Sequence, residues 1–125
     1  VGWSLGGVVA RELARRQPAH VRRVFTLGSP ISGSPEANNV TTLLKLLRRS
    51  PAAVDRPTFD ARRPSPPVAC VAIHSKTDGV VAWQCSLEDP AANTENVEVR
   101  GSHGGLVCNL EVLAALAARL PLPPH

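Results

Sequence analysis

Hydrophobic and polar positions follow two different periods along this chain. Near the N-terminus, Val8, Val9 and Leu13 fall on one side of a helical projection and charged residues on the other, which predicts an amphipathic helix. Pro18 ends that helix, because proline cannot continue the helical hydrogen bonds. Over residues 106–120, leucine and alanine recur at spacings of three and four, which predicts a second helix before the final prolines.

Three shorter segments have the composition of strands. Residues 21–27 are rich in β-forming side chains and end at a glycine turn. Residues 68–74 form a nearly unbroken apolar run, typical of a strand buried on both faces of a parallel sheet. Residues 96–100 alternate and predict a short strand near the sheet edge. Together with the helices, these strands predict an α/β architecture with a mainly parallel sheet.

Residues 29–67 differ in composition from their surroundings. Glycine, serine, proline and asparagine are frequent, and seven of the twelve prolines fall here. One short helix is predicted over 40–49, with leucines on its apolar side. The segment is too long for a plain connection, so we expect an excursion over the protein surface.

Composition narrows the class of protein. The 125 residues, 43% of them hydrophobic, suffice for one packed domain. No apolar run is long enough to predict a transmembrane helix. The net charge of +4 comes from scattered basic pairs, and four aromatic residues cannot form a stacking platform, so no nucleic-acid partner is expected. Because the chain starts at Val1 and contains no methionine, we expect a piece of a longer protein, whose compartment and oligomeric state stay open.

Residues 2–6, with the sequence GWSLG, match the pattern G-x-S-x-G. In this motif a strand turns sharply into a helix, and the central serine, here Ser4, adopts a strained backbone conformation. Both flanking positions, Gly2 and Gly6, are expected to be glycine because larger side chains would collide there. The helix predicted directly after the motif fits this interpretation, and a plain glycine-serine turn that caps a helix is the alternative.

A serine nucleophile needs a base within hydrogen-bond reach. His103 is the best candidate, because it follows the last predicted strand in a glycine-rich loop that lets the imidazole reach over the sheet edge. The other histidines have simpler interpretations. His20 is expected on the surface and His125 is the last residue, while His74 ends a buried strand as a structural hydrogen-bonding residue.

The base in turn needs a carboxylate that orients it. Asp78 follows the carboxyl end of the buried strand 68–74, where open α/β sheets bind their ligands. An ordinary Asp-Gly turn is the alternative for Asp78. Asp55 and Asp60 fall in the proline-rich excursion, and Asp89 precedes a proline in a turn.

These segments, in the order Ser…Asp…His, resemble the α/β-hydrolase superfamily and in particular its lipases and esterases. Residues 27–33 are also similar to the segment after the next strand in lipase-like esterases. The resemblance covers nearly the whole chain, 1–125, as the carboxyl-terminal part of one hydrolase domain truncated at its N-terminus. It implies Ser4 as nucleophile, His103 as base and Asp78 as orienting acid, with the N–H of Leu5 in the oxyanion hole and with no metal or cofactor.

The implied activity is cleavage of carboxylic esters, with a small ester or lipid as substrate. Residues 29–67 would then form part of a cap over the acyl pocket. Trp3 and the leucines of the predicted cap helix are the candidate substrate contacts, although ordinary core packing is an equal alternative for the leucines. These leucines are Leu43, Leu44, Leu46 and Leu47. The other functions left open are acyl transfer, thioester hydrolysis and a non-catalytic truncated chain, and we expect the 125 residues alone to be neither stably folded nor active.

The three cysteines have no C-x-x-C spacing, so a zinc site is not expected. Cys70 falls in the buried strand and is expected to be an inert core thiol. Cys85 follows the loop of Asp78, and Cys108 follows the loop of His103. Because both loops must converge in a working site, we hypothesise a Cys85–Cys108 disulfide that braces them.

Overall fold

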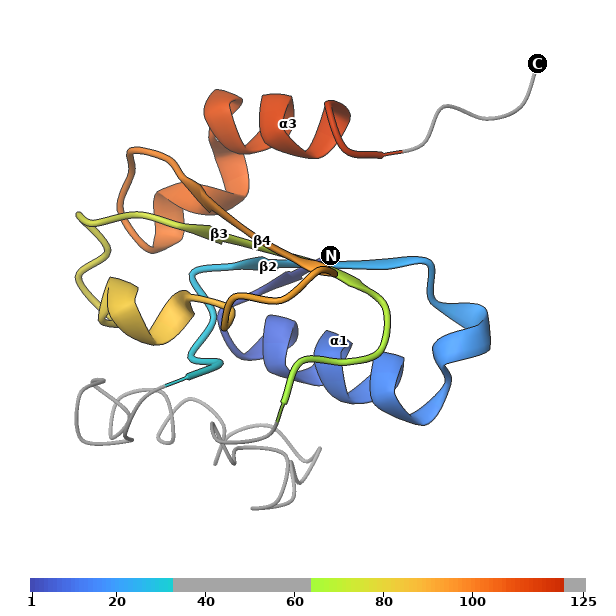
Figure 1. Ribbon diagram of the computed structural model, residues 1–125. Coiled ribbons are helices and arrows are strands. Elements are labelled where there is room, and N and C mark those ends of the chain that lie inside the picture. Colours follow the sequence, from blue (N-terminus) through green and yellow to red (C-terminus); the bar gives the residue numbers. More distant parts are fainter. Residues whose placement is uncertain (33–63, 121–125) are drawn as a thin grey trace, which may run out of the picture.

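The computed structural model describes residues 1–32 and 64–120 (Figure 1). They contain one four-stranded sheet in the order β1-β2-β3-β4, with every neighbouring pair parallel. The strands are β1 (Gly2–Trp3), β2 (Arg23–Leu27), β3 (Ala69–His74) and β4 (Thr94–Glu98). The predicted parallel α/β architecture is therefore confirmed. The predicted helix over 40–49 with its leucines, and Asp55, Asp60 and His125, lie outside the described residues.

Among the described residues, an α-helix covers each face of the sheet, as Figure 1 shows. Helix α1 (Leu5–Arg16) packs on one face, where Ala14 joins Val24 and Cys70 in a buried cluster. Helix α3 (Leu110–Ala117) packs on the other face over the largest cluster. That cluster contains Phe25, Leu27, Val71, Ile73, Val99, Leu106, Val112 and Ala115. Successive strand residues point to opposite faces, so the continuous apolar run of β3 supplies both layers.

Two element boundaries differ from those predicted, and each has a local cause. Strand β4 covers 94–98 instead of 96–100, because its partner β3 ends at His74, which pairs with Glu98. The helix predicted over 106–120 is divided into the 3-10 helix η5 (Gly104–Cys108) and α3. Asn109 lies between them in an extended conformation, and its side chain accepts hydrogen bonds from the N–H groups of Glu111 and Val112. This N-cap starts a new helix instead of continuing the old one.

The hypothesised Cys85–Cys108 disulfide is wrong, since all three cysteines are thiols. Cys85 is buried in the 3-10 helix η4 (Trp83–Ser86), in a cluster with Val81 and Leu5 on the α1 side of the sheet. Cys108 is exposed at the end of η5, on the side of α3 (Figure 1). The loops converge at the sheet edge, but the 3-10 helices that carry the two cysteines lie on different sides of the sheet (Figure 1). Cys70 is a core residue, as predicted, and burial raises the pKa of its thiol.

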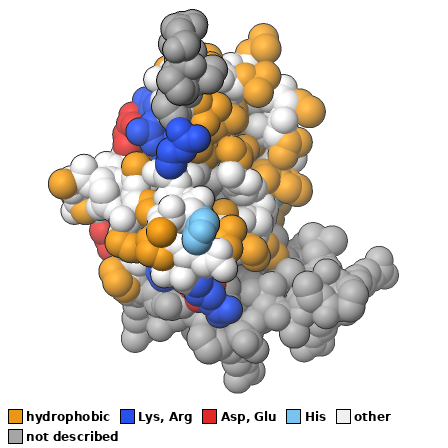
Figure 2. Space-filling model, turned by 90° about the vertical axis from the view of Figure 1, so that its right-hand side faces the viewer, with side chains coloured by type: hydrophobic (Ala, Val, Ile, Leu, Met, Phe, Trp, Pro, Cys, Tyr) orange, Lys and Arg blue, Asp and Glu red, His pale blue; other side chains and the backbone are white. Residues whose placement is uncertain are grey.

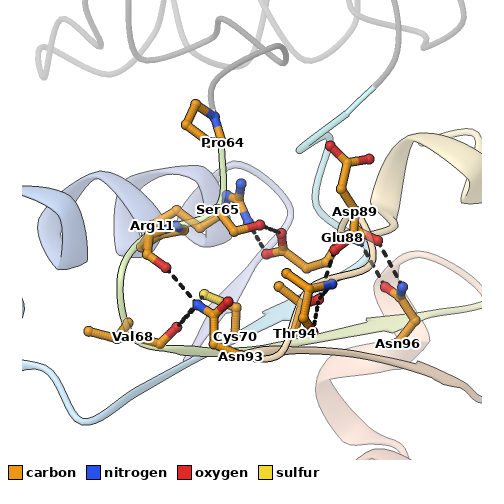
Figure 3. Close-up of polar contacts among 12 residues, drawn as sticks. Arg11, Pro64, Ser65, Val68, Cys70, Glu88, Asp89, Asn93, Thr94 and Asn96 are labelled. Atoms are coloured by element: carbon orange, nitrogen blue, oxygen red, sulfur yellow. Dashed lines mark hydrogen bonds and ion pairs between the residues drawn. The ribbon is translucent and has the colours of Figure 1, made fainter.

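A buried ion pair connects α1 with the segment after η4 (Figure 3). The Arg11 guanidinium donates to the Glu88 carboxylate, and both residues are 4% exposed. Glu88 also accepts a hydrogen bond from the Ser65 hydroxyl, and its backbone makes two hydrogen bonds of 2.8 and 2.9 Å with the Asn96 side chain of β4. Burial, with the nearby charge of Arg15, lowers the pKa of Arg11 to about 10, so the guanidinium stays charged at neutral pH.

Both helices keep apolar side chains on their outer surfaces. The exposed large hydrophobic residues of α1 and α3 are Val9, Leu13, Leu110 and Leu113. On the face shown in Figure 2, hydrophobic side chains gather along the right-hand side of the view. In the part of the chain that the structure describes, none of the helices is long and apolar enough to cross a bilayer.

Candidate active site

Four residues of the candidate site each follow a different strand. Ser4 comes directly after β1, Gly28 directly after β2, Asp78 four residues after β3 and His103 five residues after β4. Because the strands are parallel, their carboxyl ends lie at one edge of the sheet, which is the edge where α/β sheets bind ligands. The topology therefore gathers residues that are up to 99 positions apart in the sequence.

Ser4 forms the sharp turn between β1 and α1. Its φ of 53° and ψ of −123° make it the one non-glycine residue with positive φ among those described, as the motif predicts. Its N–H donates to the Leu27 carbonyl at 2.8 Å, which anchors the turn to β2. Its hydroxyl makes no capping hydrogen bond to α1, so the alternative of a plain capping turn does not describe it.

The glycines around Ser4 differ in how much space the structure leaves for a side chain. A side chain at Gly2 would lie 2.2 Å from the Gly6 carbonyl oxygen, so the prediction for Gly2 is confirmed. The prediction for Gly6 is wrong, because a side chain there would meet nothing within 4 Å. Gly7 is the confined position instead: a side chain there would lie 1.9 Å from the Ser29 hydroxyl oxygen, which packs against the first turn of α1.

His103 lies between Ser4 and Asp78. Its Nε2 is 3.0 Å from the Ser4 hydroxyl oxygen, and its Nδ1 is 2.8 Å from Asp78 Oδ2. The Asp78 side chain is 1% exposed and His103 is 7% exposed, so little water competes for these contacts. With a carboxylate at Nδ1, that nitrogen holds the ring proton, and the lone pair of Nε2 faces the serine hydroxyl. This arrangement can remove a proton from Ser4 when it attacks an electrophile.

Asp78 is held by its own turn. Its Oδ1 accepts hydrogen bonds from the N–H groups of Val80 and Val81, both at 2.9 Å, which leaves Oδ2 directed at His103. Asp78 is thus both the residue of an Asp-Gly turn and the carboxylate next to His103, because the turn orients its side chain. Asp89, considered as an alternative, lies exposed in the turn before Pro90.

The remaining described histidines do not join this group. His20 is exposed in the 3-10 helix η1 (Pro18–His20), as predicted. His74 is buried at the end of β3 and stacks on Trp83, with ring centroids 5.8 Å apart. Its Nδ1 has no hydrogen-bond partner among the described residues, so the hydrogen-bonding role expected for His74 is not seen at this atom. The contact that the structure shows for the ring is the stacking on Trp83. Burial lowers the pKa of His74, which favours the neutral ring that stacking uses.

Leu5 and Trp3 flank the candidate nucleophile. Leu5 is the first residue of α1, and the first N–H groups of a helix have no partner within it. Its N–H lies at the positive end of the helix dipole, where a developing negative charge is stabilised. Trp3, proposed as a substrate contact, is 41% exposed but donates its indole N–H to the His103 carbonyl oxygen at 2.8 Å.

Gly28 is a site residue that sequence reasoning missed. Its φ is +53°, and a side chain there would lie 2.7 Å from Asp78 Oδ2 and 3.4 Å from His103 Nδ1. The glycine therefore lets the acid and the base approach each other over the end of β2. A glycine directly after a predicted strand, at the edge that carries the other site residues, is the signal that identifies it.

Replacing Gly28 with alanine is expected to displace the Asp78–His103 pair. Since misplacing reacting groups by about 1 Å can cost roughly 100-fold in rate, we expect a loss of about that size in the rate of any reaction in which His103 activates Ser4. Gly79→Ala is the matched control, because Gly79 belongs to the Asp78 loop and has open space around it. Steady-state kinetics of the two variants make the comparison, and equal activity in both would contradict the role of Gly28.

Comparison with known proteins identifies the fold. No protein-family model and no curated protein matches the sequence. Among solved structures, a thioesterase domain from the curacin biosynthetic pathway matches with a TM-score of 0.53 and 11% identity, over 94% of this chain and 63% of that chain. The NocB thioesterase domain, in a covalent complex with a fluorophosphonate nocardicin G analog, matches with a TM-score of 0.49 and 26% identity, over 94% and 60%.

The first of these likenesses, together with the parallel sheet and its flanking helices, defines the fold as the α/β-hydrolase type. The chain spans about three fifths of the length of either thioesterase domain.

Proposed function

We propose that this protein is a serine hydrolase that cleaves carboxylic esters through an acyl-enzyme. The observation that carries the proposal is the unbroken line of hydrogen bonds from Asp78 through His103 to Ser4, on a strained turn at the N-terminus of α1. A backbone strain of this kind is retained where surrounding structure holds it, and such positions cluster at active sites. Serine, histidine and aspartate in these contacts form the group that activates a hydroxyl for acyl transfer.

Each group has a defined step in this mechanism. His103 Nε2 accepts the Ser4 proton while the serine oxygen attacks the acyl carbonyl, and Asp78 stabilises the imidazolium. The Leu5 N–H and the N-terminal end of α1 stabilise the negative charge on the carbonyl oxygen. His103 then returns the proton to the leaving alcohol. Water, activated by the same histidine, finally releases the acid from Ser4.

Thioester hydrolysis is the second candidate, with acyl transfer as a variant of it. The observation that favours it is the thioesterase domain among the structural neighbours. The acyl-enzyme chemistry is the same, but the leaving group is a thiolate, which needs less help from the proton on His103. Oxoester and thioester substrates with the same acyl group distinguish the two, and an acceptor alcohol or amine in place of water tests for transfer.

Apolar side chains surround Ser4 and can contact a substrate. Leu5 and Val80 pack together around buried Val81 next to the site, and the Trp3 ring is partly exposed beside it. We therefore propose an acyl group with an apolar chain, bound by the exposed part of the Trp3 ring and by Leu43, Leu44 and Leu47. Residues 29–67 remain the proposed cap over this group, within a chain that we propose to be the carboxyl-terminal part of one hydrolase-fold domain.

A fluorophosphonate probe tests the proposed function without knowledge of the substrate. It reacts with a serine that an adjacent base activates, so we expect one covalent adduct, located on Ser4 by peptide mass spectrometry. Ser4→Ala should abolish labelling, whereas Ser32→Ala is the control, because the Ser32 hydroxyl contacts the Gln84 carbonyl and not His103. The whole protein is used for this test, and absence of labelling in its unaltered form would favour a non-catalytic chain instead.

A further inference from the structure

Trp3 connects the two halves of the candidate site. It directly precedes Ser4, and its indole N–H donates a hydrogen bond of 2.8 Å to the backbone carbonyl of His103, 100 positions away in the sequence. Its ring also lies against the imidazole, with centroids 5.1 Å apart and planes inclined by 39°. The turn that presents the nucleophile is thus bonded to the loop that presents the base.

The loop around His103 needs such support, because Gly101, Gly104 and Gly105 surround the histidine and glycine permits many backbone conformations. The start of this loop is held by the Asp78 loop. The Ser75 hydroxyl donates to the Gly101 carbonyl at 2.6 Å, and the Thr77 hydroxyl donates to the same carbonyl at 3.0 Å. Trp3 supplies a second attachment, at His103 itself.

The contact suits positioning better than substrate binding. An indole has one N–H and no acceptor, so the hydrogen bond to His103 uses the whole polar capacity of Trp3. The bond also acts on the backbone of His103, which determines how far the imidazole reaches toward Ser4. A substrate can contact only the exposed part of the ring, and that contact would not involve the N–H.

We infer that Trp3 is a positioning residue, which keeps His103 Nε2 within hydrogen-bond reach of the Ser4 hydroxyl through its indole N–H. The inference rests on the proposed function, because the distance it maintains matters only if His103 activates Ser4. It differs from the substrate contact expected from the sequence, and the two roles have different kinetic consequences.

Trp3→Phe tests the inference, because it removes the N–H and keeps an aromatic ring. We expect kcat for ester cleavage, and the rate of fluorophosphonate labelling at Ser4, to fall by about tenfold, the loss that one neutral hydrogen bond commonly accounts for. KM should change little. The matched control is Trp83→Phe, since Trp83 is the other tryptophan and stacks on His74, not on His103. Thermal unfolding should show that both variants are folded.

A double-variant cycle shows whether Trp3 acts through His103. In a His103→Ala background, Trp3→Phe should leave the residual rate unchanged, because the group that it positions is gone. An equal loss in both backgrounds, or a raised KM with unchanged kcat, would overturn the inference in favour of a substrate contact. Cleavage by the whole, unaltered protein is measured first. If that activity is absent, the proposed function fails and the positioning role fails with it; if it is present and Trp3→Phe keeps full kcat, only the positioning role fails.

Discussion

Ser4→Ala, His103→Ala and Asp78→Asn are each expected to lower kcat of the whole protein for ester cleavage by roughly 10³-fold or more, because the members of such a triad act as a unit. Ser4→Ala removes the attacking oxygen, and His103→Ala removes its base. Asp78→Asn keeps the size of the side chain, but its amide can donate to Nδ1, which favours the wrong tautomer of His103. Steady-state kinetics on an ester substrate measure the three losses.

The chain offers matched controls for this prediction. His20→Ala and Asp89→Asn change exposed residues of the same types away from the line of hydrogen bonds, so both should keep wild-type turnover. The double variant Ser4→Ala/His103→Ala should be no slower than either single variant, since one substitution already disables the unit. Wild-type-like turnover after His103→Ala would remove the assignment of the base.

The second large effect is expected on stability, at the buried Arg11–Glu88 pair. Glu88→Ala leaves the Arg11 guanidinium buried without its carboxylate, and breaking a buried pair in this way costs about 3–5 kcal/mol in the free energy of unfolding. Arg11→Met leaves the carboxylate of Glu88 in the same position and should cost a similar amount. Urea unfolding of each variant of the whole protein measures the change.

Two further variants test whether burial of the Arg11–Glu88 pair causes the expected loss of stability. The double variant Arg11→Met/Glu88→Leu removes both charges, so it should recover most of the loss, because well-packed apolar replacements of buried pairs are often neutral. Glu95→Gln breaks the exposed ion pair between Glu95 and Arg119, and water screening should limit its cost to less than about 1 kcal/mol. Equal small costs at both pairs would mean that water reaches Arg11 and Glu88 as well.

Much of the fold and the identity of the candidate triad were predictable from local sequence. The strand at β3 follows from a continuous apolar run, and α1 follows from its apolar spacing and Pro18. The turn at Ser4 is predicted by the motif around it. The places of Asp78 and His103 after predicted strands identify them as the candidate acid and base. These features depend on residues that are neighbours in the chain, so their physical cause can be read from short segments.

Other features were decided only when distant segments packed together. Gly28 matters because Asp78 and His103 meet above it, and Arg11 is buried because Glu88 faces it from another loop. Cys85 and Cys108 were expected to pair from the loops they follow, but packing placed their helices on different sides of the sheet.

The sequence by itself therefore determined the parallel α/β architecture and the three residues proposed for catalysis, because these residues follow the predicted strands, and the carboxyl ends of parallel strands share one edge of the sheet. Only the tertiary structure decided how these residues are supported. The Trp3 hydrogen bond to His103, the space above Gly28 and the buried charge pair each join residues at least 50 positions apart. The hydrophobic periodicity of the sequence does not predict contacts of that kind, because they arise from the packing of side chains between distant segments.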